Sequence, residues 1–114
     1  YKMKPRVKLW LEIDEEVVFG AGRVRLLRYI DSLGSINKAA NKLNMSYRAA
    51  WGKIKASEER LDIKLIETQV GGAKGGGTQL TSKAKEILAE YQRYENEVEK
   101  KMKKVYQDIL ADLF

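Results

Sequence analysis

Tyr47 and Arg48, followed by Gly52 and Lys53, are the residues of this 114-residue chain whose types and spacing are best suited to recognition chemistry. An arginine can donate two hydrogen bonds to the edge of a guanine, and a lysine attracts a phosphate. On a helix, Gly52 would allow close approach to a duplex, and Tyr47 can pack on a thymine methyl group or reach a phosphate. These residues predict contact with the major groove of DNA.

Two short helical patterns surround these residues. Ser35 is placed to cap a first helix, in which Ile36, Ala39, Ala40 and Leu43 recur at helical spacing. Asn44–Ser46 supplies a three-residue turn, and Ser46 can cap a second helix that ends near Leu61. The pattern predicts a helix-turn-helix over about 35–61, with Ser35 and Lys38 toward phosphate and Ser46 among the DNA-binding residues.

Residues 63–80 predict a hairpin, or wing, after the helix-turn-helix. A strand over 63–70 is followed by the glycine-rich loop Gly71–Gly77 and a returning strand over 78–80. A nucleotide-binding phosphate loop is not expected, because Lys74 precedes Gly75 rather than serine or threonine and strand follows the glycines. Two readings remain: a flexible spacer, or a wing tip in which Lys74 follows the phosphate backbone.

The net charge of +6 is confined to one part of the chain. Residues 17–80 hold eleven Lys and Arg against five Asp and Glu, whereas the segments before and after are balanced. Local basicity of this kind indicates a polyanionic partner.

The composition argues against catalysis. The chain has no cysteine and no histidine, so we expect no enzyme, no cofactor and no metal site. A hydrolase using serine or lysine has no positive support. The cluster Asp14–Glu16 is either a solvated turn or a divalent-ion site, and the turn is favoured.

The flanking segments predict a hairpin, a first helix and a long last helix. Val7, Leu9, Leu11 and Ile13 alternate over 6–14 as one buried strand face, a short strand follows over 17–19, and a helix then ends at Gly34. The helix over 47–61 is expected to bury Trp51 with Ala50, Ile54 and Leu61. From Ala84, apolar residues recur at helical spacing to the chain end, at Ile87, Tyr91, Tyr94, Val98, Met102, Val105, Ile109 and Leu113.

A helix of about 30 residues is about 45 Å long, more than a domain of this size can cover. Its outer half therefore predicts a dimer seam with a second chain. The fold class is α+β and mainly helical: a winged helix-turn-helix with an N-terminal β-hairpin and a long C-terminal dimerisation helix. We expect residues 1–80 to bind DNA and residues 81–114 to dimerise.

No apolar run is long enough to span a membrane, and no signal peptide is visible, so a cytoplasmic protein without membrane contact is expected.

Specific motifs resemble the N-terminal DNA-binding domain of the molybdate-responsive ModE regulators, which is related to the LysR type. They are Gly34-Ser35-Ile36 with Ala39, Ser46-Tyr47 with Ala50-Trp51, and Glu67 before a glycine-rich wing that ends in Leu80-Thr81. The resemblance covers roughly 7–94 and implies a homodimer, joined through the first and last helices, on a palindromic operator. It implies that Ser46, Tyr47, Arg48 and Trp51 belong to the recognition helix, Trp51 in a structural role. The implied interface residues are Leu27, Tyr91, Tyr94, Val98, Met102, Val105 and Ile109.

The sequence departs from that family in three places. Ala73 precedes Lys74 in the wing, Thr68 stands where arginine is frequent, and the sequence ends at Phe114, before the position where full-length family members add molybdate-binding domains. We therefore expect no molybdate site within this chain, which either lacks the sensor or is a fragment, and Tyr1 in place of methionine is compatible with trimming. The leading interpretation is a sequence-specific transcription regulator. The alternatives are a protein-interaction module or a non-specific, chromatin-type nucleic-acid-binding module.

Overall fold

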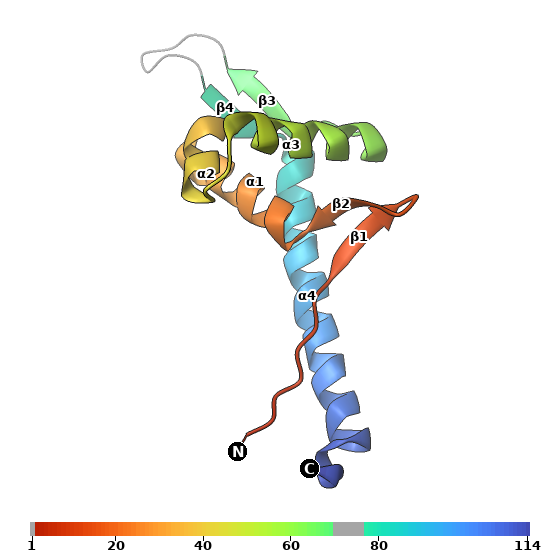
Figure 1. Cartoon of the computed structure of the whole chain (residues 1–114). Coiled ribbons are helices and arrows are strands. Elements are labelled where there is room, and N and C mark those ends of the chain that lie inside the picture. The colour runs from red at the N-terminus through yellow and green to blue at the C-terminus, as the bar shows by residue number, and fades with distance from the viewer. Residues whose placement is uncertain (1, 70–76) are drawn as a thin grey trace.

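The computed structural model describes residues 2–69 and 77–114 and confirms a winged helix-turn-helix (Figure 1). The described residues form two antiparallel hairpins, three packed helices, one long helix and a short 3-10 turn. The elements are β1 (Trp10–Ile13), β2 (Glu16–Gly20), α1 (Ala21–Leu33), α2 (Ile36–Lys42), α3 (Tyr47–Leu61), β3 (Ile66–Gln69), β4 (Gly77–Leu80), α4 (Ser82–Ile109) and a 3-10 turn, η1 (Ala111–Leu113).

The N-terminal hairpin forms, but the predicted buried face of its first strand is wrong. β1 pairs with β2 from Trp10↔Gly20 to Ile13↔Glu16, and Asp14 and Glu15 make the turn with φ of 51° and 68°. Every residue of β1 is exposed, whereas Val18 and Phe19 of β2 are buried. The hairpin projects from the body so that nothing covers β1 (Figure 1). Residues 2–9 form an extended arm along α4 instead of strand.

The helix boundaries follow local capping signals, as predicted. Gly34 ends α1 in the left-handed conformation with φ of 70°, and Ser35 caps α2 by accepting from the Lys38 N–H at 3.1 Å. Asn44 makes the turn with φ of 54°, and the Ser46 hydroxyl accepts from the Ala49 N–H at 3.0 Å. These caps fix where α3 begins.

The wing packs tightly on the end of α1. β3 and β4 pair from Ile66↔Leu80 to Gln69↔Gly77, and β3 is shorter than the predicted strand over 63–70. The Thr78 N–H donates to the Gly34 carbonyl at 3.0 Å. A Cβ on Gly77 would lie 2.9 Å from the same carbonyl oxygen, so glycine is required there. The predicted Lys74 contact lies outside the described residues.

The core lies between the three helices, β2, the wing and the first turns of α4. Its largest fully buried apolar side chains are Phe19, Leu26, Leu27, Ile30, Ile54 and Leu65. Tyr91 is the last buried residue of α4; its ring meets Phe19 edge-on at 5.0 Å, and its hydroxyl donates to the Leu9 carbonyl at 3.1 Å. Beyond it the helix leaves the body as a stalk (Figure 1), and the described residues extend over 61 × 31 × 23 Å.

Three predicted placements are corrected by burial. Leu27 is 1% exposed and Tyr91 is 5% exposed, so both are used by the chain's own core and have no surface for a second chain. Trp51 is 45% exposed rather than buried. Helical spacing identified the apolar positions of each helix. The packing of neighbouring elements decided which of these positions are buried. Among the described residues, no helix is both long enough and apolar enough to cross a membrane.

Candidate nucleic-acid interface

The recognition helix α3 has one buried face and one exposed face. Ala50, Ile54, Ser57 and Glu58 are buried against the body. Arg48 and Gly52, one turn apart, are exposed on the opposite side, and among the described residues nothing apart from neighbouring residues and backbone of the same helix lies within 4 Å of the position a Gly52 Cβ would take. The predicted exposure of this face is confirmed.

Two aromatic side chains lie beside Arg48. Tyr47 is 51% exposed and Trp51 is 45% exposed, and a spacing of four residues places them on neighbouring turns of α3. The Lys55 ammonium lies 5.7 Å from the centre of the Trp51 ring. Because Glu58 Oε1 holds the Lys55 ammonium at 3.0 Å, this flank offers mainly its aromatic rings, which are suited to sugar and thymine methyl contacts.

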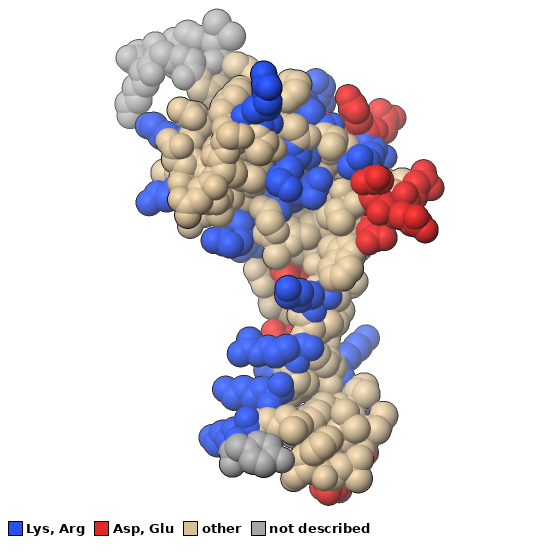
Figure 2. Space-filling model, viewed as in Figure 1, with Lys and Arg blue, Asp and Glu red and all other residues tan. Residues whose placement is uncertain are grey.

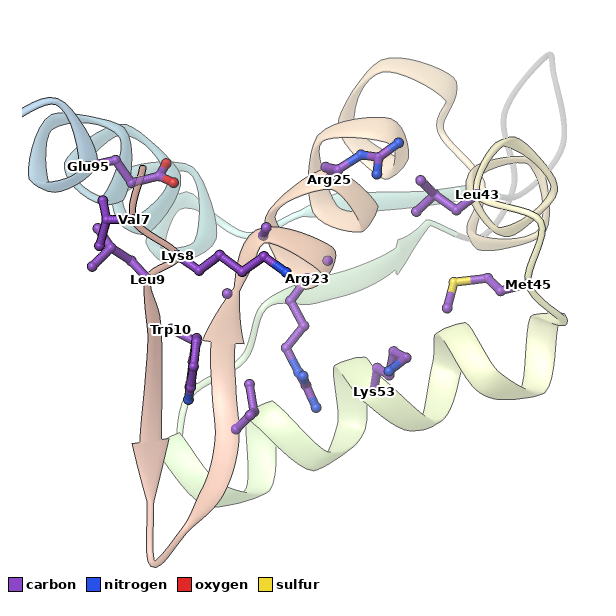
Figure 3. A pocket seen from close by; sticks show the side chains of 14 residues that line it. Val7, Lys8, Leu9, Trp10, Arg23, Arg25, Leu43, Met45, Lys53 and Glu95 are labelled. Atoms are coloured by element: carbon purple, nitrogen blue, oxygen red, sulfur yellow. The ribbon is translucent and has the colours of Figure 1, made fainter. Parts of the chain in front are cut away.

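Lys53 belongs to a different flank than the sequence indicated. It follows Arg48 by five positions, which places it about 140° further around the helix. There it lines a hollow of about 600 Å³ together with Arg23 and Arg25 of α1 (Figure 3). The hollow is also lined by Lys8 and Trp10 near the hairpin and by Met45 of the turn.

Sequence reasoning missed the two arginines of α1. Arg23 donates from Nε to the Ser57 hydroxyl at 2.7 Å, and Ser57 donates to the Val18 carbonyl at 2.7 Å. Burial, with the nearby charge of Arg60 added, lowers the pKa of Arg23. No sequence signal links Arg23 to α3, because the two segments meet only through tertiary packing.

The residues predicted from α2 lie at its start. Lys38 is exposed, and Ser35 is half-buried with its hydroxyl occupied by the capping hydrogen bond. The Ser46 hydroxyl is occupied in the same way. Both serines thus shape the helix-turn-helix through caps, and Lys38 takes part in no ion pair among the described residues.

Charge is distributed unevenly over the molecule. Figure 2 shows basic side chains over the helical body and along one side of the stalk, and acidic ones gathered mainly at the tip of the β1–β2 hairpin. Within the described residues, Arg48 and Lys53 take part in no ion pair. Asp14 and Glu15 form the hairpin turn and Glu16 begins β2. Among the described residues, no group of three acidic side chains is placed to hold a metal ion. The free cations of α3 are therefore available to an anionic partner.

The predicted interface residues of the stalk differ in exposure. Tyr94 is 43% exposed, Val105 is 54% exposed and Ile109 is 65% exposed, whereas Val98 and Met102 are half-buried. The N-terminal arm accounts for part of the burial of Met102, because Pro5, Val7 and Leu9 line a small hollow with that side chain. Leu110, Leu113 and Phe114 add further exposed apolar surface at the stalk end.

Comparison with known proteins matches residues 22–85 to the bacterial regulatory helix-turn-helix proteins of the lysR family. A transcriptional regulator ModE of Haemophilus influenzae is 36% identical over 85 residues, which are 75% of this chain and 33% of the relative. A molybdenum transport protein ModE of Azotobacter vinelandii is 38% identical over 90 residues, 79% of this chain and 33% of the relative. A DNA-binding transcriptional dual regulator ModE of Escherichia coli K12 is 29% identical over 89 residues, 78% of this chain and 34% of the relative. The chain spans about a third of the length of these relatives.

Proposed function

The chain belongs to the lysR family of bacterial regulatory helix-turn-helix proteins, and on that premise we propose that it is a sequence-specific DNA-binding transcription regulator. The observation that carries the proposal is the exposed face of α3, where Arg48 and Gly52 lie opposite the buried Ala50 and Ile54. A helix presented in this way by a capped turn can enter the major groove. The regulatory names of the relatives support the same conclusion.

In this proposal the side chains of α3 have different roles. Arg48 reads a base edge, and Gly52 keeps the helix close to the groove floor. Tyr47 and Trp51 pack along the sugar and base edges on one flank. Lys53, with Arg23 and Arg25 nearby, attracts phosphate on the other flank, and Lys38 does so from α2.

We further propose that two copies assemble through α4. The supporting observation is the exposed apolar surface of the stalk, at Tyr94, Val105 and Ile109, with Val98 and Met102 half-covered. Residues 1–80 would then bind DNA and residues 81–114 would join the copies. Two recognition helices related by a two-fold axis fit a palindromic operator whose half-sites are about 34–36 Å apart.

The relatives' names refer both to transcription regulation and to molybdenum transport. We propose a ModE-like DNA-binding role for these residues and assign none of them to molybdate. A DNA-binding role also places the protein in the cytoplasm, where bacterial DNA is located.

Selection of bound duplexes from a random DNA pool tests the proposal. The expected product is a motif with two-fold symmetry, and Arg48→Ala is expected to lose the preference at one position in each half-site. Binding without an enriched motif would favour a non-specific, chromatin-type role. Absence of binding at low salt would favour a protein-interaction module and overturn the proposal.

A further inference from the structure

One carboxylate joins the recognition helix to the wing. Glu58, in the last turns of α3, is 8% exposed. Its Oε2 accepts from the backbone N–H of Leu65 at 2.8 Å and from that of Ile66 at 3.3 Å. Ile66 is the first residue of β3, so a side chain of α3 holds the residues at which the wing begins. No other side chain of α3 does so among the described residues.

The second oxygen of Glu58 is also occupied. Oε1 accepts from Lys55 Nζ at 3.0 Å, and the same ammonium lies over the ring of Trp51. Burial disfavours the charged carboxylate, but the N–H donors of Leu65 and Ile66 and the Lys55 cation outweigh it and hold the pKa of Glu58 below its ordinary value. Glu58 therefore stays ionised with every bond in place near neutral pH, and it connects the exposed flank of α3 to the wing.

The other attachments of the wing lead to different elements. Thr78 N–H donates to Gly34 at the end of α1, and Thr81 N–H donates to the Leu65 carbonyl at 3.0 Å. The Thr81 hydroxyl donates to the Lys64 carbonyl at 2.8 Å while it caps α4. The Leu65 peptide thus lies between α3 and α4, with Glu58 on its N–H and Thr81 on its carbonyl.

We propose that Glu58 is a positioning residue that sets the orientation of the β3–β4 wing relative to α3, and thereby the joint fit of helix and wing to one duplex. The proposal rests on the proposed DNA-binding function for its effect on affinity, but the positioning itself is independent of DNA. A carboxylate with two backbone N–H donors resists rotation of the wing base better than a single bond does. Without the Glu58 carboxylate, the orientation of the wing would have to be fixed when DNA binds. The entropy lost in fixing that orientation weakens the affinity for DNA.

The test uses the absence of native cysteine to place spin labels by Lys53→Cys on α3 and Gln79→Cys on β4, both at exposed positions. Label-to-label distances are measured without DNA in three backgrounds: Glu58→Ala, Glu58→Gln and the exposed neighbour control Glu59→Gln. The expected distribution is broad for Glu58→Ala, intermediate for Glu58→Gln, which keeps one acceptor oxygen, and unchanged for Glu59→Gln.

Affinity for a selected duplex is then measured in the same three variants without labels or label sites. We expect about a tenfold loss for Glu58→Ala and a smaller loss for Glu58→Gln. Loss of a negative charge alone would strengthen binding, and Glu59→Gln measures that effect. Should Glu58→Ala fail to fold, Glu58→Gln carries the test.

Unchanged distance distributions in the Glu58 variants would overturn the positioning role. If the unaltered chain failed to bind any duplex while the distributions still broadened, the positioning role would stand and the DNA-binding function would fall. Broadened distributions with unchanged affinity would overturn the proposed link between wing orientation and binding.

Discussion

The body of the molecule and its stalk use the same residue types in opposite ways. On the stalk helix α4, five ion pairs join lysine or arginine to an acid three or four residues away, for example Lys103 to Glu99 at 3.2 Å. On the body, Arg48 and Lys53 of α3 have no such partner among the described residues. Cations paired within their own helix have little charge to offer a ligand, so Arg48 and Lys53 are better placed to attract an anion than the paired cations of α4.

Apolar side chains also differ between the two regions, in how far they are buried. In the body, Ile30, Ala39 and Ala50 are fully buried. On the stalk, Ile109 is 65% exposed, and the surface at the stalk end is largely uncharged (Figure 2). The body is thus complete as a folded unit, whereas the stalk offers apolar surface to a partner. The comparison teaches that the unpaired cations of α3 and the exposed apolar surface of the stalk end lie in different parts of the described structure, which suits the proposed DNA binding in one part and the proposed assembly in the other.

The largest effect should follow from a cavity in the body. Ile30→Ala removes a side chain that is 0% exposed, so we expect a loss of about 2–5 kcal/mol in the free energy of unfolding. Ile109→Ala is the matched control on the stalk, and its effect on the unfolding of an isolated chain should be much smaller. Urea unfolding at low protein concentration measures both. Equal losses of unfolding free energy in the two variants would contradict the contrast between a buried core in the body and an exposed surface on the stalk.

Charges placed on the stalk should separate the copies. Val105→Glu combined with Ile109→Glu is expected to weaken dimerisation by about a hundredfold, because each change replaces apolar surface that a partner would cover. Sedimentation of the purified chain measures the association. Asn96→Glu combined with Gln107→Glu adds the same charge at exposed polar positions and serves as control. A monomer in the unaltered chain at micromolar concentration would contradict the proposed seam.

Removing Arg48 of α3, unpaired among the described residues, should reduce DNA-binding specificity more than removing a cation from the stalk. Arg48→Ala is expected to reduce discrimination between the best and the second-best base by about 1–3 kcal/mol. Lys103→Ala, which removes a stalk cation paired with Glu99, should leave both specificity and salt dependence unchanged. Competition binding with duplexes that differ at one position distinguishes the two. A similar loss from both variants would place the duplex along the stalk and not on α3.

The smallest expected effect is on the stability of the fold at acid pH. The pKa of Glu58 in the folded chain is held below its ordinary value by the Leu65 and Ile66 N–H groups and Lys55, against the opposing effect of burial. Its contribution is therefore complete above the ordinary glutamate pKa, about 4.3, and is lost as the pH falls through the lower folded value. Glu58→Gln should remove on the order of 1 kcal/mol of that acid dependence in urea unfolding, and Glu59→Gln should remove none. Parallel pH profiles for all three chains would contradict this assignment.

The sequence by itself determined the local features of this protein. The caps at Ser35 and Ser46 and the left-handed positions at Gly34 and Asn44 were predictable, because each depends on hydrogen bonds and backbone conformations within a few residues. The order of elements, the helix-turn-helix, the wing and the location of the basic segment followed from spacing and charge in the same way.

Only the tertiary structure decided which side of each amphipathic element is covered. Leu27 and Tyr91 lie on stripes that suit either a core or an interface, and packing against Ile54 and Phe19 placed them in the core. Trp51 and β1 are exposed because, among the described residues, no distant segment covers them. The hydrogen bonds of Glu58 with the wing and the meeting of Arg23 with α3 also join segments that share no local periodicity. Burial and long-range contact depend on where remote parts of the chain come to lie, and no window of the sequence contains that information.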